Sequence, residues 1–209
     1  MNTDHPADRL QPENGWAIPA TPRLPPPARR ERGVLFRTVS RVSGLFGRPQ
    51  VPDIFSVLHV NARLFWPWLL FASQLMPFGR LTAADREKII LRTAWNCRSR
   101  YEWGQHIEIA LKAGVTDDDI VSVAKGPAAF ADRHTCALMQ ACDDVFLRQC
   151  IADSTWDILS ETFSRELLIE IVMLIGHYIM LAGFLNTAGI ALEAPLEKTL
   201  QDFHQRLKP

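Results

Sequence analysis

The chain has 209 residues, 47% of them hydrophobic, and its 23 basic side chains are balanced by 23 acidic ones. This length is sufficient for one well-filled core with an appended tail. Nucleic-acid-binding proteins normally carry a basic excess, so a net charge of zero argues against a nucleic-acid partner.

The cysteine pattern points to a reducing compartment. The four cysteines, at positions 97, 136, 142 and 150, form no Cys-x-x-Cys and no zinc-type spacing, so we expect no metal and no other cofactor. The N-terminus shows no apolar signal segment, and the longest apolar run, 64–78, contains two prolines and is too short to span a bilayer. We therefore expect a cytoplasmic protein with free thiols and no membrane partner.

Residues 1–30 are rich in proline and poor in large apolar side chains, which predicts an extended or disordered tail. Residues 31–209 are expected to form a single domain. Its first part, to about residue 45, combines several arginines with apolar residues at helical spacing. We interpret this part as a short amphipathic helix that packs on the body or on a partner subunit.

From Asp53 onward the chain shows helical patterns and no alternating strand pattern, so the predicted fold is all-α. Capping residues mark the helix starts, and glycine or proline marks several ends. Pro67 is expected in the first turn of its helix, and the last long helix is apolar almost all round, which predicts burial. The predicted helices cover 53–66, a short helix from 67, 82–96, 99–114, 116–126, 132–149, one from 154 or 155, 165–186 and 195–207.

The candidate site lies where one predicted helix ends and the next begins near Ser99. Glu102 and His106 are four residues apart and share a helix face. A carboxylate beside an imidazole can fix its tautomer and tune its pKa, which is the minimal unit of acid–base catalysis. A hairpin of the two helices would bring Glu87 toward His106. Simpler interpretations are a capping box formed by Ser99 and Glu102 and a hydrogen-bonded core histidine.

The segment 81–127 resembles the carboxymuconolactone decarboxylase and AhpD-like alkylhydroperoxidase family. The matching residues are Leu81-Thr82, Glu87, Ala94-Trp95, Tyr101-Glu102-Trp103-x-x-His106, Ala110, Ala113-Gly114 and Gly126-Pro127. The similarity continues through Tyr178 to Asn186. The resemblance implies an AhpD-like helical bundle that assembles into oligomers and acts on a small molecule.

The redox branch of that family carries Cys-x-x-Cys-x-x-x-His at the helix start. Here the two thiol positions are occupied by Ser99 and Glu102, which form no disulfide. The glutamate and histidine of the family's proton relay correspond to Glu87 and His106. Cys97 lies two residues before the first thiol position and is a candidate lone thiol.

The resemblance therefore favours acid–base chemistry on a small carboxylate or lactone. The expected catalytic residues are Glu87, Glu102 and His106, with Glu102 as the orienting partner of His106 or as the base. The expected substrate-binding residues are Ser99, Tyr101 and Trp103, helped by the free amides of the helix start. Two alternatives remain, a peroxidase or peroxiredoxin-type activity through Cys97, and a non-catalytic homologue.

Two spatial expectations follow from this interpretation. The three catalytic side chains should meet at the mouth of a pocket lined by Tyr101, Trp103 and the apolar run 66–71. The apolar content of residues 54–78 and of the last long helix exceeds what one small bundle can hide from water. We therefore expect a homo-oligomer, a dimer or higher.

Overall fold

The computed structural model describes residues 10–28, 31–32 and 52–207. Within this described part the chain forms helices and no strand, so the prediction of an all-α fold is confirmed. The predicted basic helix lies almost entirely outside the described residues.

The element bounds agree with most of the predicted helices. The elements are α2 (Asp53–Leu58), the 3₁₀ turn η1 (His59–Asn61), α3 (Ala62–Leu75), α4 (Ala83–Asn96), α5 (Arg100–Lys112), α6 (Asp117–Lys125), the 3₁₀ turn η2 (Pro127–Ala129), α7 (Arg133–Arg148), α8 (Asp153–Thr162), α9 (Arg165–Ala188) and α10 (Ala194–Arg206).

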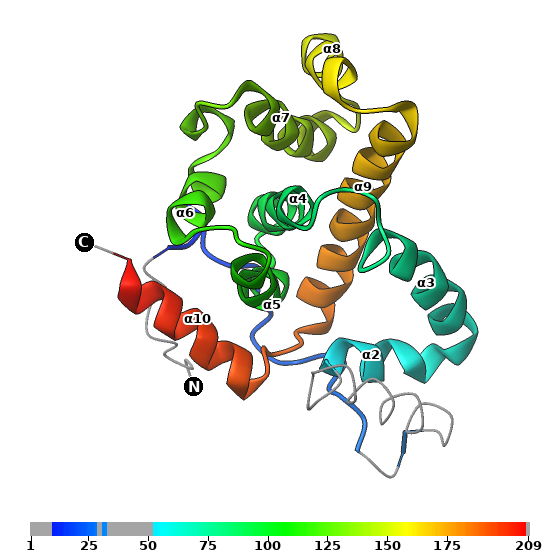
Figure 1. The fold of residues 1–209 in the computed structure, drawn as a ribbon. Helices are drawn as coiled ribbons and strands as arrows, with labels where there is room; N and C mark the ends of the chain where they lie inside the picture. The colour runs from blue at the N-terminus through cyan, green and yellow to red at the C-terminus, as the bar shows by residue number, and fades with distance from the viewer. Residues whose placement is uncertain (1–9, 29–30, 33–51, 208–209) are drawn as a thin grey trace.

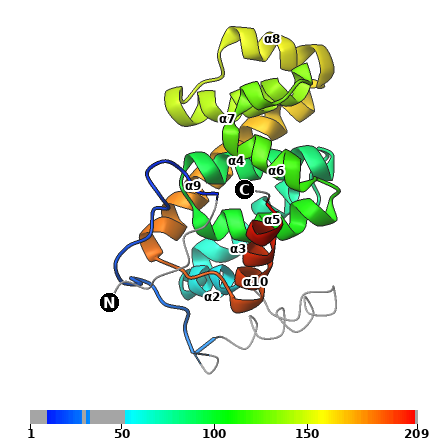
Figure 2. The same cartoon turned by 90° about the vertical axis from the view of Figure 1, so that its left-hand side faces the viewer.

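Helix α4 lies at the centre of the bundle, with α5, α6, α7 and α9 around it (Figure 1). Its residues Ile89–Leu91 are all fully buried, which requires a helix that is covered on every side. Helix α10 crosses the outer side of α5, and α8 lies beyond α7 at the opposite end (Figure 2). The central position of α4 places any polar residue of its inner turns in the core.

Side-chain caps start several helices as predicted. The Thr82 hydroxyl accepts a hydrogen bond from the Asp85 amide, and Thr116 and Asp119 form a reciprocal capping box. Ser99 precedes α5, but its hydroxyl is buried and makes no capping bond. The predicted Ser99–Glu102 capping box is therefore wrong, because both side chains are turned into the protein interior.

Two other helix predictions need correction. Pro67 lies inside α3 and not in its first turn, because the turn η1 ends at Asn61 and α3 begins directly after it. Helix α9 is not buried all round, since Ile169 and Met180 are 65% and 56% exposed. One side of α9 contributes to the core, and the other side faces outward.

The described part of the N-terminal segment, residues 10–28, contains no helix and is held against the bundle. The Trp16 ring packs on Trp95 and Trp103, with ring centroids 5.7 Å and 6.0 Å apart. The Ala17 amide donates to the Arg98 carbonyl, 2.9 Å away. Residues 10–28 thus have an irregular backbone with a turn and bends, and they cover the α4–α5 turn.

Candidate active site

The site is built on the tight hairpin between α4 and α5. Arg98 adopts a left-handed backbone conformation (φ 53°), and the Ser99 amide donates to the Ala94 carbonyl over 2.8 Å. From α9, the Asn186 side chain donates to the Cys97 carbonyl and fixes the turn. The hairpin brings the two helices together, so that residues far from the turn on α4 and α5 face each other.

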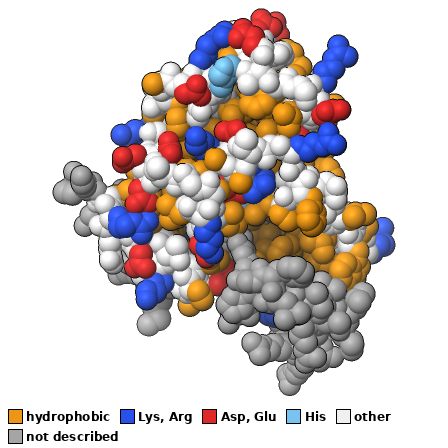
Figure 3. All heavy atoms as spheres, in the orientation of Figure 1, with side chains coloured by type: hydrophobic (Ala, Val, Ile, Leu, Met, Phe, Trp, Pro, Cys, Tyr) orange, Lys and Arg blue, Asp and Glu red, His pale blue; other side chains and the backbone are white. Residues whose placement is uncertain are grey.

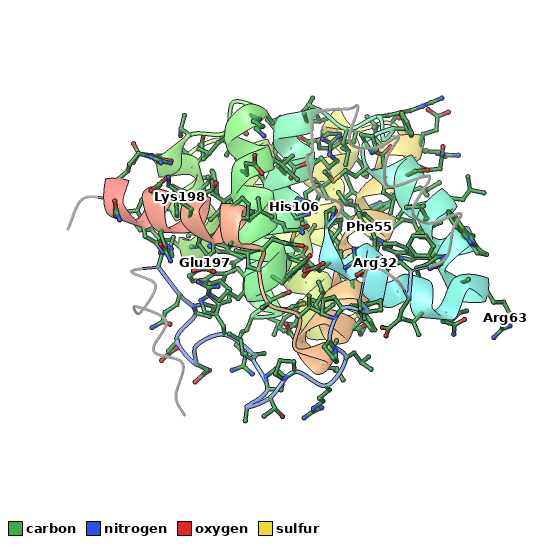
Figure 4. The ribbon with its side chains drawn as sticks, turned by 90° about the horizontal axis from the view of Figure 1, so that it is seen from below. Arg32, Phe55, Arg63, His106, Glu197 and Lys198 are labelled. Atoms are coloured by element: carbon green, nitrogen blue, oxygen red, sulfur yellow. The ribbon has the colours of Figure 1, made fainter. Side chains whose placement is uncertain are left out.

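Glu87 of α4 and His106 of α5 meet in this way. The distance between Glu87 Oε2 and His106 Nδ1 is 2.7 Å, and the two residues are 0% and 5% exposed. Arg86 Nε donates to the other carboxylate oxygen over 3.1 Å. Since the carboxylate accepts a hydrogen bond from Nδ1–H, Nε2 is left as the basic nitrogen of the ring. Figure 4 shows His106 inside the molecule, seen from below.

Glu102 is buried one turn before His106, and neither of its carboxyl oxygens has a hydrogen-bond partner. Burial raises the pKa of this carboxyl well above its usual value of 4.5. The raised pKa favours the protonated, neutral form of Glu102. It does not orient His106, because Glu87 has that role.

The structure does not place the predicted pocket residues around His106. The Tyr101 hydroxyl donates to Glu193 over 2.7 Å and accepts from Gln105, so it links α5 to the segment before α10. Trp103 is fully buried beside Trp95, with its indole nitrogen unpartnered. Both side chains are buried, and their role in lining a pocket at His106 stays a prediction.

Two open cavities lie elsewhere on the described surface. The larger, of about 430 Å³, includes Cys150 and Trp156 in its lining, and the smaller, of about 260 Å³, includes Arg92 and Asp143. Neither is lined by Glu87, Glu102 or His106. Access to the Glu87–His106 pair therefore has to come from another side.

Sequence reasoning missed the neighbours of His106 on α9. The Tyr178 ring lies edge-on to the His106 ring, with centroids 5.2 Å apart. The adjacent His177 is buried as well, and its Nδ1 has no hydrogen-bond partner. The signal in the sequence was the pair His177-Tyr178 within the otherwise apolar stretch 171–185 of this helix.

Cys97 is half-buried, and its environment does not activate the thiol. Burial, and to a lesser extent the neighbouring Glu102, raise its pKa to about 12. Among the described residues no group of three or more His, Cys, Asp or Glu side chains is placed to hold a metal ion. The site offers an imidazole, two carboxyl groups and an unreactive thiol.

Cys97 should consequently resist alkylation at neutral pH. We expect iodoacetamide at pH 7.5 to modify the exposed Cys150 well before Cys97, as read by peptide mass spectrometry. Because the thiolate is the nucleophile and pH 7 to 9 lies below the pKa of Cys97, the rate of Cys97 alkylation should rise about tenfold per pH unit over this range. A rate at Cys97 that reaches a plateau below pH 9 would contradict the raised pKa.

Comparison with known proteins relates this geometry to a family. Residues 62–142, from α3 into α7, match the carboxymuconolactone decarboxylase family, and they include Glu87 and His106. This match supports a relationship of the chain to the carboxymuconolactone decarboxylase/AhpD-like family. No curated protein matches its sequence closely enough to add a narrower assignment.

Solved structures show the same fold. An AhpD-core, uncharacterized peroxidase-related protein from Ralstonia eutropha JMP134 is 19% identical with a TM-score of 0.74, over 84% of this chain and 94% of that chain. A peroxidase-related protein from Silicibacter sp. TM1040 is 13% identical with a TM-score of 0.72, over 90% and 97%. The debrominase Bmp8 is 16% identical with a TM-score of 0.69, over 85% and 96%. The predicted AhpD-like bundle is thereby confirmed for this chain.

Proposed function

We propose that this protein is an acid–base enzyme that acts on a small lactone or carboxylate. The observation that carries the proposal is the buried 2.7 Å contact between Glu87 and His106, with Arg86 on the second carboxylate oxygen. Such a pair holds the imidazole in one tautomer and stabilises the imidazolium formed when Nε2 takes a proton.

Glu102 supplies the complementary acid. His106 and Glu102 lie on one face of α5, so a base and a protonated carboxyl stand one turn apart. In a decarboxylation, the bond between the carboxylate and its carbon breaks, CO2 leaves, and the electron pair remains on that carbon, conjugated with a carbonyl. The Glu102 carboxyl then delivers its proton to the carbon, and His106 Nε2 takes a proton from solvent and returns it to the Glu102 carboxylate, which regenerates the acid. Burial favours the neutral form of Glu102, and this form does not repel the substrate carboxylate.

The peroxidase alternative lacks support from the thiols of the site. Ser99 and Glu102 stand at the two thiol positions, and the pKa of the remaining Cys97 is raised to about 12. Cys97→Ser should therefore leave turnover unchanged. Loss of turnover in Cys97→Ser would favour the lone-thiol peroxidase.

The proposal is tested by CO2 release from 4-carboxymuconolactone and from simple lactone carboxylates. We expect turnover by the wild type and a fall in kcat of about 10² to 10⁴ in His106→Gln, the usual range for a general base. His134→Gln, on the outer surface of α7, is the matched control and should retain turnover. Equal turnover in His106→Gln and the wild type would refute the assignment.

We further propose a homo-oligomer formed through the outer faces of α3 and α9. The segments Asp53–Leu75 and Arg165–Ala188 are long and apolar enough to cross a membrane by length and composition, yet only 22% and 39% of their most apolar windows are buried. Hydrophobic side chains gather over this region, partly beside grey atoms (Figure 3). Because α9 also contributes to the core, contact with other copies accounts for these faces better than a bilayer does.

Light scattering at micromolar concentration checks the assembly. We expect a mass of at least twice 23.6 kDa for the wild type. Leu70→Glu, on the exposed side of α3, should reduce the mass, whereas Leu147→Glu on α7 should not. A monomer, or co-sedimentation of the wild type with phospholipid vesicles, would contradict the proposal.

A further inference from the structure

An aromatic cluster fills the contact between α3 and α9. Its members, the α3–α9 aromatic cluster, are Phe55, Phe65, Trp68, Phe71, His177 and Tyr178. The Trp68 and His177 rings stack at 6.0 Å with an interplanar angle of 18°, and Phe71 meets His177 edge-on at 5.6 Å. Five of the six members carry no charge, and burial lowers the pKa of His177 to about 4, so this histidine is neutral at pH 7.

Two polar atoms in this cluster lack hydrogen bonds. His177 is only 7% exposed, and its Nδ1 is buried without a partner; Trp68 Nε1 is also buried without a partner. Each unmade bond costs about 1–3 kcal/mol, and native interiors rarely leave buried polar groups unsatisfied. The indole N–H of Trp68 is a donor, and the neutral imidazole of His177 is a second donor when it carries its proton on Nδ1, so the two rings can both donate to one ligand oxygen.

The cluster leads directly to the catalytic pair. Tyr178 contacts His177 on one side, with centroids 5.4 Å apart, and contacts His106 on the other at 5.2 Å. Of the fourteen residues of α3, only Phe65 and Leu75 are buried, so little packing opposes a shift of α3. The space-filling view shows a hollow lined by hydrophobic atoms between α3 and α9 (Figure 3).

We propose that the α3–α9 aromatic cluster binds a flat, uncharged ring bearing a carbonyl or hydroxyl oxygen, such as an unsaturated lactone, and presents it to His106. The ring packs against the aromatic side chains, and its oxygen hydrogen-bonds to Trp68 Nε1 and His177. Because the ring is presented to His106, this inference rests on the proposed acid–base function. The inference narrows the proposed substrate from lactones and carboxylates in general to ring compounds. The part of the compound that lies in the α3–α9 aromatic cluster is uncharged.

Equilibrium dialysis with coumarin, a flat neutral lactone, tests the proposal. We expect saturable binding to the wild type and at least tenfold weaker binding of benzoate, the flat but charged comparison. Trp68→Phe and His177→Phe keep a ring but remove the polar atoms, and each should weaken coumarin binding about tenfold, the equivalent of one hydrogen bond of about 1.4 kcal/mol. Trp156→Phe, on α8, is the matched control and should bind coumarin like the wild type.

The outcomes separate this site from the proposed reaction. Glu87→Gln should bind coumarin like the wild type even if its turnover is lost, because Glu87 lies behind His106. Circular dichroism checks that the variants are folded. If one of the two cluster variants, Trp68→Phe or His177→Phe, does not fold, the coumarin affinity of the other tests the proposal. Absence of saturable coumarin binding by the wild type, or an unchanged affinity in both cluster variants, would overturn the proposal.

Discussion

Replacing Glu87 by alanine is expected to lower the free energy of unfolding by about 3–5 kcal/mol, the range found when one partner of a buried charged pair is removed. The carboxylate is 0% exposed and accepts bonds from both His106 and Arg86. Alanine would leave the Arg86 guanidinium, itself only 8% exposed, without its carboxylate partner. Urea unfolding monitored by circular dichroism measures the change.

Glu87→Gln is the matched variant for function. The amide oxygen of glutamine can still accept a hydrogen bond from His106 Nδ1–H. The free energy of unfolding should therefore fall less in Glu87→Gln than in Glu87→Ala. The amide carries no charge to stabilise an imidazolium, and kcat should fall by about 10² or more. A Glu87→Gln enzyme with wild-type kcat would remove Glu87 from the proposed relay and leave it a purely structural role.

Glu102→Gln is expected to make the protein more stable at pH 8, with a gain that disappears toward pH 4.5. The folded-state pKa of Glu102 is raised above its usual value of 4.5. Below pH 4.5 the carboxyl is protonated in both the folded and the unfolded state, so it has no pH-dependent effect. Above pH 4.5 the Glu102 carboxyl ionises in the unfolded state but not yet in the folded state. The free energy of unfolding of the wild type therefore falls by up to about 1.4 kcal/mol per pH unit until the folded-state pKa is reached. Glutamine cannot ionise and avoids this loss.

The test is the unfolding midpoint of wild type and Glu102→Gln in urea at pH 5, 6, 7 and 8. Asp132→Asn provides a control of opposite sign, because hydrogen bonds from Thr135 lower the pKa of the Asp132 carboxyl. Asp132 stabilises the folded state above its usual pKa, so Asp132→Asn should be less stable at pH 7, with a difference that shrinks as the pH falls. A pH-independent difference between Glu102→Gln and the wild type would show that Glu102 is ionised in the folded protein.

Local signals in the sequence determined much of the helical framework. Thr82, Thr116 and Ser164 each precede a helix and cap it with their own side chains, an interaction that spans three residues. The resemblance to the family identified Glu87 and His106. A hairpin of two helices was enough to bring them together, because the hairpin depends on the short turn at 97–99.

Only the tertiary structure decided the environment of Ser99 and Glu102 and the position of Trp16. Ser99 and Glu102 have the sequence of a capping box, but both are enclosed by the rest of the protein, and burial raises the pKa of Glu102. Trp16 stands in a proline-rich segment, and its contact with Trp103 joins residues 87 positions apart. Burial, pKa and long-range contacts depend on the whole fold, whereas caps and helical periodicity depend on neighbours within a turn.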